Sequence, residues 1–167
     1  QATGDWLMFL DDDDLLYADH VETLVGELLK QPKSVAAYSL AWEVPSRLEA
    51  GGATICEGEY HQVKGLMQPY EPERLEYMNF IPIQSILFSK SLFDERGGFN
   101  EEIDHLEDWN LWSRYSVGKS FTYVEKTTSL YRVPQSFEER AKRQKALDEA
   151  YSRVKAINDI ERDSIRN

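Results

Sequence analysis

Four consecutive aspartates placed directly after an apolar run are the feature that most constrains this chain. Residues 6–10 (WLMFL) are uninterruptedly apolar, and Asp11 to Asp14 follow at once. Such a run is typical of a strand that is buried on both faces of a parallel or mixed sheet. Carboxylates crowded at its end repel one another, at roughly 4 kcal/mol for a pair ~4 Å apart in an effective dielectric of ~20. A bound cation offsets that repulsion, so we expect a cation site rather than a merely solvated acidic run.

The spacing of these acids suits the binding of one ion by two of them. In an extended chain alternate side chains point to the same side, so two aspartates in Asp-x-Asp spacing can bind the same cation. Carboxylate oxygens suit a hard divalent cation, and the predicted cofactor is therefore Mn²⁺ or Mg²⁺. At the end of a strand in an α/β sheet, such an ion would neutralise phosphate on a ligand and assist a leaving group.

The charge distribution agrees with a localised acidic site. The net charge is −11, and residues 1–30 hold eight acids against one lysine, whereas the segment from residue 137 onward is nearly balanced. A nucleic-acid-binding surface needs the opposite sign, so we expect no nucleic-acid partner.

Features that mark membrane or secreted proteins are absent from the sequence. No stretch approaches the ~20 apolar residues of a membrane-spanning helix, and we expect no signal peptide at the start. Cys56 is the single cysteine, which excludes an internal disulfide and suits a reducing compartment. The predicted location is the cytoplasm, with at most a peripheral association with a membrane.

Periodicity and turn residues predict an α/β fold with a mixed sheet flanked by helices. Apolar residues recur at helical spacing at 19–30, 91–96, 107–117 and in a long segment after residue 136, and helices 19–30 and 136 onward open with predicted capping boxes. Strands are predicted at 34–44, 80–88, 120–124 and 127–132. Residues 45–75 are punctuated by glycine and proline and predict loops and short strands, with a short helix near 72–78.

A second acidic pair, Glu107 and Asp108, opens one of the predicted helices. Acids in the first turn of a helix are favoured by its dipole and need no catalytic role. The preceding loop, 97–106, would nevertheless deliver the pair to an edge of the sheet, where a carboxylate can act as a general base. Trp109 and Trp112 follow on the same helix, and aromatic residues at this spacing either belong to the core or stack on a sugar.

Several stretches together resemble the family 2 glycosyltransferases, which are enzymes of the GT-A fold. The resemblance rests on ATGDWLMFLDDDDL, NFIPIQSILFSKSLFDERGGFNEE, EDWNLWSRY and SLYRVP, in this order, and it covers about residues 2–134. It implies that residues 1–134 form a partial GT-A (Rossmann-like) sheet that lacks the N-terminal nucleotide-binding strands. The amphipathic helix in residues 135–167 lies outside the resemblance and is expected to pack on the body of this domain.

The resemblance also implies an activity, namely transfer of a sugar from a nucleoside diphosphate sugar to an acceptor hydroxyl, with inversion and a bound metal. Asp11 and Asp13 would bind the nucleotide sugar and the metal. Asp108 would be the base, with Glu107 next in line, and Trp109 and Trp112 would bind the acceptor. The acceptor is expected to be a carbohydrate or a lipid-linked molecule. Without the missing N-terminal half of its own domain, the chain alone is expected to be inactive.

Two departures and two alternatives stand beside this resemblance. The family's N-terminal half precedes Gln1, and many members carry a histidine, sometimes a metal ligand, shortly after the Tyr-Arg pair, where this chain has Val133, Pro134 and Gln135. A haloacid-dehalogenase-like phosphatase also places Asp-x-Asp after a buried strand and uses Mg²⁺, but it needs a downstream lysine. A non-catalytic domain that binds carbohydrate or a partner protein would carry the same residues without activity.

Overall fold

The computed structural model describes residues 2–49 and 54–167. Its helices are α1 (His20–Lys30), α2 (Lys90–Arg96), α3 (Glu107–Ser116) and α4 (Phe137–Arg166), with single 3-10 turns η1 (Lys64–Leu66), η2 (Arg74–Glu76) and η3 (Ile83–Ser85). Its strands are β1 (Trp6–Leu7), β2 (Leu15–Leu16), β3 (Ser34–Leu48), β4 (Ile55–Glu57), β5 (Ile86–Ser89) and β6 (Ser120–Pro134). No helix in these ranges is long and apolar enough to cross a bilayer.

The strands form one mixed sheet. Its order is β1-β5-β3-β6-β2, and β4 pairs with β3 outside this path. β3 and β6 run parallel along most of their length, and the other described pairs are antiparallel. The register between β3 and β6 shifts near Leu40, which explains why 120–124 and 127–132 look like two strands in the sequence although they are parts of one.

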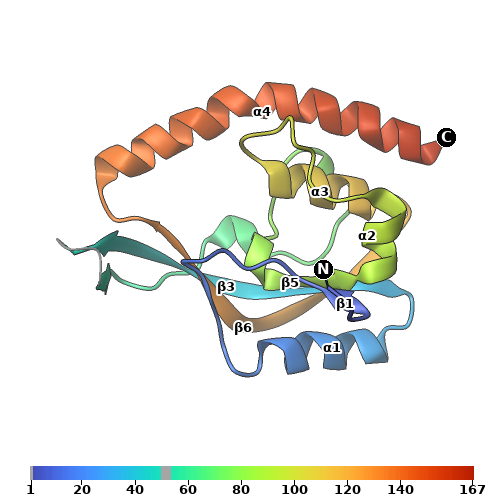
Figure 1. Ribbon diagram of the computed structural model, residues 1–167, viewed down its shortest axis with the longest axis horizontal. Coiled ribbons are helices and arrows are strands. Elements are labelled where there is room, and N and C mark those ends of the chain that lie inside the picture. Colours follow the sequence, from blue (N-terminus) through green and yellow to red (C-terminus); the bar gives the residue numbers. More distant parts are fainter. Residues whose placement is uncertain (1, 50–53) are drawn as a thin grey trace.

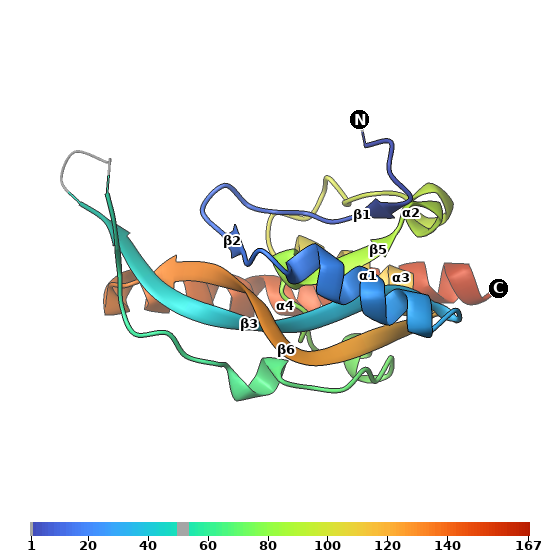
Figure 2. The ribbon, with the colours of Figure 1, turned by 90° about the horizontal axis from the view of Figure 1, so that it is seen from below.

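Helices cover both faces of this sheet, which confirms the predicted fold class (Figure 1). Alternate residues of β3 face opposite sides because side chains alternate along a strand. Ala37 packs with Leu24 and Leu28 of α1 on one face, and Figure 2 shows α1 lying along that face. Tyr38 packs on the other face in the larger cluster that contains Trp112 of α3.

The predicted strand over residues 6–10 is shorter and less buried than expected. Only Trp6 and Leu7 pair with β5, both are half-buried, and Leu10 is 50% exposed. The physical reason is that β1 has one neighbouring strand within the described part of the chain, so it forms an edge of this sheet. The aspartates therefore lie in a loop beyond the ladder, where the amide of Asp14 donates to the carbonyl of Asp11 at 3.3 Å.

Other predicted elements differ in detail. The Asp19 side chain makes no capping hydrogen bond, because its carboxylate pairs with Lys126 at 2.5 Å. The predicted cap at Ser136 is present, with its hydroxyl accepting from the amide of Glu139 at 3.3 Å. The strand predicted from residue 80 begins only at Ile86, after the turn η3, and the helix predicted near 72–78 is the single turn η2.

Helix α4 has two halves with different surroundings. Its second half packs on α3: Val154 is buried in a cluster with Trp109, and Tyr151 stacks on Trp109 with ring centroids 5.2 Å apart. In its first half every residue from 137 to 145 is exposed, including Phe137 at 81%. The predicted apolar stripe therefore packs only from its middle onward.

Buried polar contacts hold the second half of α4 on α3. Arg162 is 3% exposed, and its Nη1 donates to the carbonyl of Ser113 and the hydroxyl of Ser116, each at 2.9 Å. Its Nη2 pairs with Glu76 at 2.6 Å, and Arg166 pairs with the same carboxylate at 2.8 Å. Burial of a guanidinium whose Nη1 and Nη2 both have partners makes this contact specific to one helix position.

Replacing Arg162 is therefore expected to destabilise the fold strongly. Arg162→Ala leaves the buried carbonyl of Ser113 and hydroxyl of Ser116 without this donor and removes the buried one of the two arginines on Glu76, which should lower the free energy of unfolding by about 3–5 kcal/mol. Arg166→Ala removes a half-exposed partner of the same carboxylate and should cost less than about 1 kcal/mol. Denaturant unfolding followed by circular dichroism measures both. Equal losses in the two variants would contradict the account.

Candidate functional site

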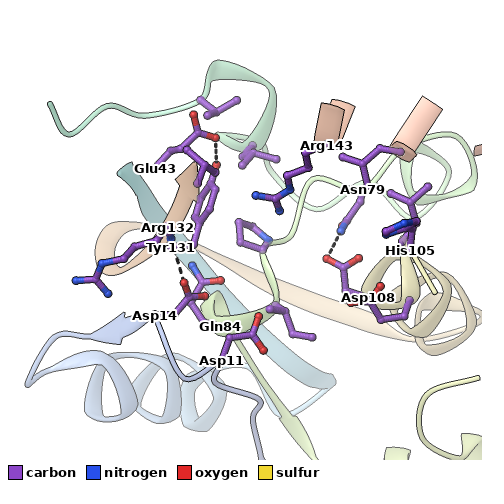
Figure 3. Close-up of a pocket in the computed structure, with 18 of the residues that line it drawn as sticks. Asp11, Asp14, Glu43, Asn79, Gln84, His105, Asp108, Tyr131, Arg132 and Arg143 are labelled. Atoms are coloured by element: carbon purple, nitrogen blue, oxygen red, sulfur yellow. Dashed lines mark hydrogen bonds between the residues drawn. The ribbon is translucent and has the colours of Figure 1, made fainter. Parts of the chain in front are cut away.

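A cavity of about 830 Å³ brings together the two acidic motifs that the sequence places far apart. Asp11 and Asp13 line it from the loop after β1, and Glu107 and Asp108 line it from the start of α3. Figure 3 shows Asp11 and Asp108 on two sides of this space. Its other lining residues come from β3, η1, η3, the loops around them, the end of β6 and the first half of α4: Asp14, Glu43, Val63, Leu66, Asn79, Pro82, Ile83, Gln84, Asp104, His105, Leu106, Tyr131, Arg132, Val133, Arg140, Arg143, Gln144 and Leu147.

Asp108 is held in one orientation by hydrogen bonds to both of its carboxylate oxygens. Oδ1 accepts from the amide of Trp109 at 2.7 Å, and Oδ2 accepts from Nδ2 of Asn79 at 2.6 Å (Figure 3). Asn79 is itself fixed, because its Oδ1 accepts from the amide of Ile81 at 3.0 Å. Leu106, two residues before Asp108, has the left-handed φ of 64°, a conformation that costs a non-glycine residue free energy and recurs at functional sites.

The surroundings of Asp108 make it a better base than an ordinary aspartate. Burial, together with the neighbouring Glu107, raises its pKa to about 6, although the hydrogen bonds from Trp109 and Asn79 offset part of the increase. A carboxylate with a pKa near 6 is still ionised at neutral pH and accepts a proton more readily than one near 4.

The aspartate loop is tied to the end of β6. Oδ1 of Asp14 accepts from the amide of Arg132 at 3.0 Å, and the Arg132 guanidinium donates to the carbonyl of Asp13 and pairs with Glu57 at 2.5 Å. Burial, with a smaller contribution from Asp13 and Asp11, raises the pKa of Asp14 to about 6, although the hydrogen bond from the Arg132 amide offsets part of the increase. Asp14, which had no predicted role, thus anchors the loop, and Asp12 does not line the cavity.

The predicted metal ligands present oxygen atoms to the cavity. Asp11 and Asp13 are exposed and line it. Among the described residues no three acidic, histidine or cysteine side chains gather closely enough to hold a metal ion. Two carboxylates nevertheless fit a hard cation of the Mg²⁺ type, which usually completes its shell with substrate phosphate and water. The metal assignment remains a prediction.

The burial of Trp109 and Trp112 contradicts the prediction that they stack on an acceptor sugar. The two side chains are 1% and 0% exposed. Trp109 Nε1 donates to the carbonyl of Leu75 at 2.7 Å, and Trp112 Nε1 donates to that of Ile81 at 3.2 Å. These two hydrogen bonds therefore fix both ends of the segment 75–81. That segment carries Asn79, which in turn donates to Asp108 and orients it.

Sequence reasoning missed several residues of the cavity. Tyr131 donates to Glu43 Oε2 at 2.9 Å across the β3–β6 pair. Gln84 is 1% exposed and lines the cavity, and its buried Nε2 has no hydrogen-bond partner among the described residues. An unpaired buried donor is costly, and a ligand acceptor atom would satisfy it. Tyr131, Arg132 and Gln84 all lie within the stretches that carry the family resemblance, but no local signal marks their individual roles, and the arginines of α4 lie outside those stretches.

The family model for glycosyl transferase family 2 matches residues 1–97, more than half of the chain. The chain therefore belongs to glycosyl transferase family 2, and its curled mixed sheet flanked by helices is consistent with a partial GT-A fold. The matched range contains the aspartate loop, Asn79 and Gln84, whereas Asp108 and α4 lie beyond it. No curated protein matches the chain.

The raised pKa of Asp14 makes a prediction about stability. At about pH 7.5 the fold holds this carboxylate ionised in unfavourable surroundings, whereas Asp14→Asn keeps an acceptor for the amide of Arg132 without the charge. The variant should gain about 1 kcal/mol in free energy of unfolding. Because the folded pKa is raised from 3.8 to about 6, the wild type gains stability as the pH falls through this window, and the difference should vanish near pH 4.

Denaturant unfolding in EDTA across this pH range measures the effect. Asp12→Asn is the matched control, because Asp12 is exposed and outside the cavity, and it should change stability by less than about 0.5 kcal/mol. A loss of stability in Asp14→Asn at about pH 7.5 would show that its charge is favourable in the fold.

Proposed function

We propose that this protein transfers a sugar from a nucleoside diphosphate sugar to an acceptor hydroxyl, with inversion at the sugar carbon. Asp108 is the general base, and Asp11 and Asp13 hold the Mn²⁺ or Mg²⁺ that accompanies the diphosphate. The observation that carries the proposal is the meeting of Asp108 with Asp11 and Asp13 around one cavity. Membership of glycosyl transferase family 2 supports the same reaction class.

Asp108 supplies the proton acceptor that inverting transfer needs. As the acceptor oxygen attacks the sugar carbon, its proton passes to a carboxylate oxygen of Asp108, and the bond from that carbon to the diphosphate oxygen breaks. The hydrogen bonds from Asn79 and Trp109 keep the carboxylate oriented toward one approach. When bound, the metal neutralises charge on the departing diphosphate.

The lining of the cavity argues against the two alternatives. The phosphatase needs a lysine near its aspartates, and the described lining residues include arginines but no lysine. A carbohydrate-binding module would present aromatic faces, whereas Trp109 and Trp112 are buried. A fixed carboxylate with a raised pKa is expected of a base rather than of a surface that only binds.

Removal of the base is expected to abolish transfer and to spare donor binding. Asp108→Asn should lower kcat by about 10²–10⁴-fold, because a positioned general base contributes that much. Because the chain alone is expected to be inactive, the measurement uses the protein with any sequence that precedes Gln1 included; it follows release of nucleoside diphosphate from a panel of nucleotide sugars with Mn²⁺, beside calorimetric binding of the same donors. Asp104→Asn, another acid of the cavity lining, should retain activity. Full turnover by Asp108→Asn would show that another residue is the base. Loss of turnover in Glu107→Gln but not in Asp108→Asn would identify Glu107 as that base.

The metal assignment makes a separate prediction. Asp13→Ala should lose at least about tenfold in affinity for a nucleoside diphosphate with Mn²⁺, because it removes one of two protein ligands. Asp12→Ala removes an equal charge from the same loop outside the cavity, so its affinity should stay within about twofold. Isothermal titration with and without EDTA distinguishes the cases. Equal affinities in the two variants would refute Asp13 as a metal ligand.

A further inference from the structure

The first half of α4 presents one face to the cavity. Arg140, Arg143, Gln144 and Leu147 all line it, and they are spaced by three and four residues, which places them on one side of a helix. This half contributes no buried residue to the core. It also lies outside the residues that the family model matches. The face is therefore a wall of the site rather than a packing surface.

Two of these residues, Arg140 and Arg143, are cations without a charged partner in the described part of the chain. Arg132, the third arginine of the lining, is engaged by Asp13 and Glu57. Among residues 2–49 and 54–167, no carboxylate pairs with Arg140 or Arg143, and no side-chain hydrogen bond satisfies either guanidinium. Figure 3 shows Arg143 directed into the cavity, between the Tyr131–Glu43 pair and the Asn79–Asp108 pair.

The charge of Arg143 acts on the cavity rather than only on solvent. The pKa of Tyr131 is raised by burial and by Glu43, and Arg143 offsets part of that increase, so its charge lies within electrostatic reach of the tyrosine. Solvated arginines are common on helices. Here, however, α4 is anchored through Arg162 and Val154, and this anchoring holds both guanidinium groups over an otherwise acidic space.

An acidic cavity repels an anionic substrate unless cations are placed to receive it. The diphosphate of the donor has its own counter-charge in the proposed metal. Two unpaired guanidinium groups on the wall formed by α4 match a second doubly charged group, because the planar fork of arginine binds phosphate oxygens in pairs.

We infer that the face of α4 formed by Arg140 and Arg143 binds a phosphate group on the acceptor, which makes the acceptor a phosphate-bearing molecule. The inference rests on the proposed function, since the hydroxyl of that acceptor must reach Asp108. Phosphate on Arg140 and Arg143 would hold the acceptor in the cavity that Asp108 also lines, and the position of the hydroxyl relative to the phosphate would then decide which acceptors react.

The test uses inorganic phosphate as the probe, in EDTA and at constant ionic strength, with binding followed by the arginine side-chain Nε–Hε signals in NMR. Arg143→Gln should weaken phosphate binding about tenfold, as expected for loss of one charge-assisted pair. Lys142→Gln removes an equal charge from the same turn outside the cavity and should change binding less than about twofold. Both positions are exposed, so both variants should keep the thermal midpoint of the wild type.

Two further arms separate this inference from the proposed transfer reaction. Asp108→Asn and Asp13→Ala should still bind phosphate, so a failed transferase test leaves this one intact. A nucleoside diphosphate with Mn²⁺ should bind without displacing phosphate from Arg143. Displacement would show that the arginines contact the donor instead and would overturn the acceptor assignment. Equal phosphate affinity in Arg143→Gln and Lys142→Gln would overturn the site itself.

Discussion

The burial of two indole rings under the segment 75–81 is the contact on which the site depends. Trp109 and Trp112 each combine a large apolar area with one N–H, and each N–H is satisfied by a backbone carbonyl of that segment. The packing of these two rings therefore fixes the position of α3, the path of the segment 75–81 and the side-chain amide of Asn79. This arrangement orients Asp108, because its carboxylate accepts one hydrogen bond from Asn79 of the segment 75–81 and one from the amide of Trp109 in α3.

Charge in the cavity is managed by a few specific contacts. The backbone amide and the guanidinium of Arg132 both restrain the aspartate loop, so the carboxylates of Asp11 and Asp13 remain at the lining without pairing with a neighbouring cation among the described residues. Asp14 and Asp108 are the two acids whose pKa values burial raises to about 6, one as an anchor and the other as the proposed base. Burial thus raises the pKa of both carboxylates, but their hydrogen-bond partners differ, and these partners determine which acid anchors the loop and which is the proposed base.

Patterns local in the sequence predicted the helices well and the site in part. Helices α2 and α3 match their predicted positions because glycines with positive φ, Gly97 and Gly118, follow them. The two acidic motifs were identified individually, and the fold then brought them together. The strand at 6–10 and the capping box at Asp19 failed for a different reason. The strand is short because β1 lies at the edge of the sheet, and the cap is absent because Asp19 pairs with the distant Lys126. Neither contact can be predicted from the neighbouring residues in the sequence.

The residues that went unpredicted share a dependence on tertiary position. Gln84 is an ordinary polar residue until η3 buries it at the cavity, and the arginines of α4 belong to a charged helix face until the contacts of Arg162 set its direction. The two tryptophans show the opposite case, because their spacing fitted both a core and a sugar-binding role and only burial decides between them.

The parallel pairing of β3 with β6 also affects how the molecule forms. These strands make the central contact of the sheet, yet their paired residues, such as Tyr38 and Tyr123, are separated by about half of the chain. Closing so long a loop carries a large entropic cost before any pairing is gained, and such topologies fold slowly. During synthesis β3 emerges long before β6, so until then one edge of the central strand stays open to other chains.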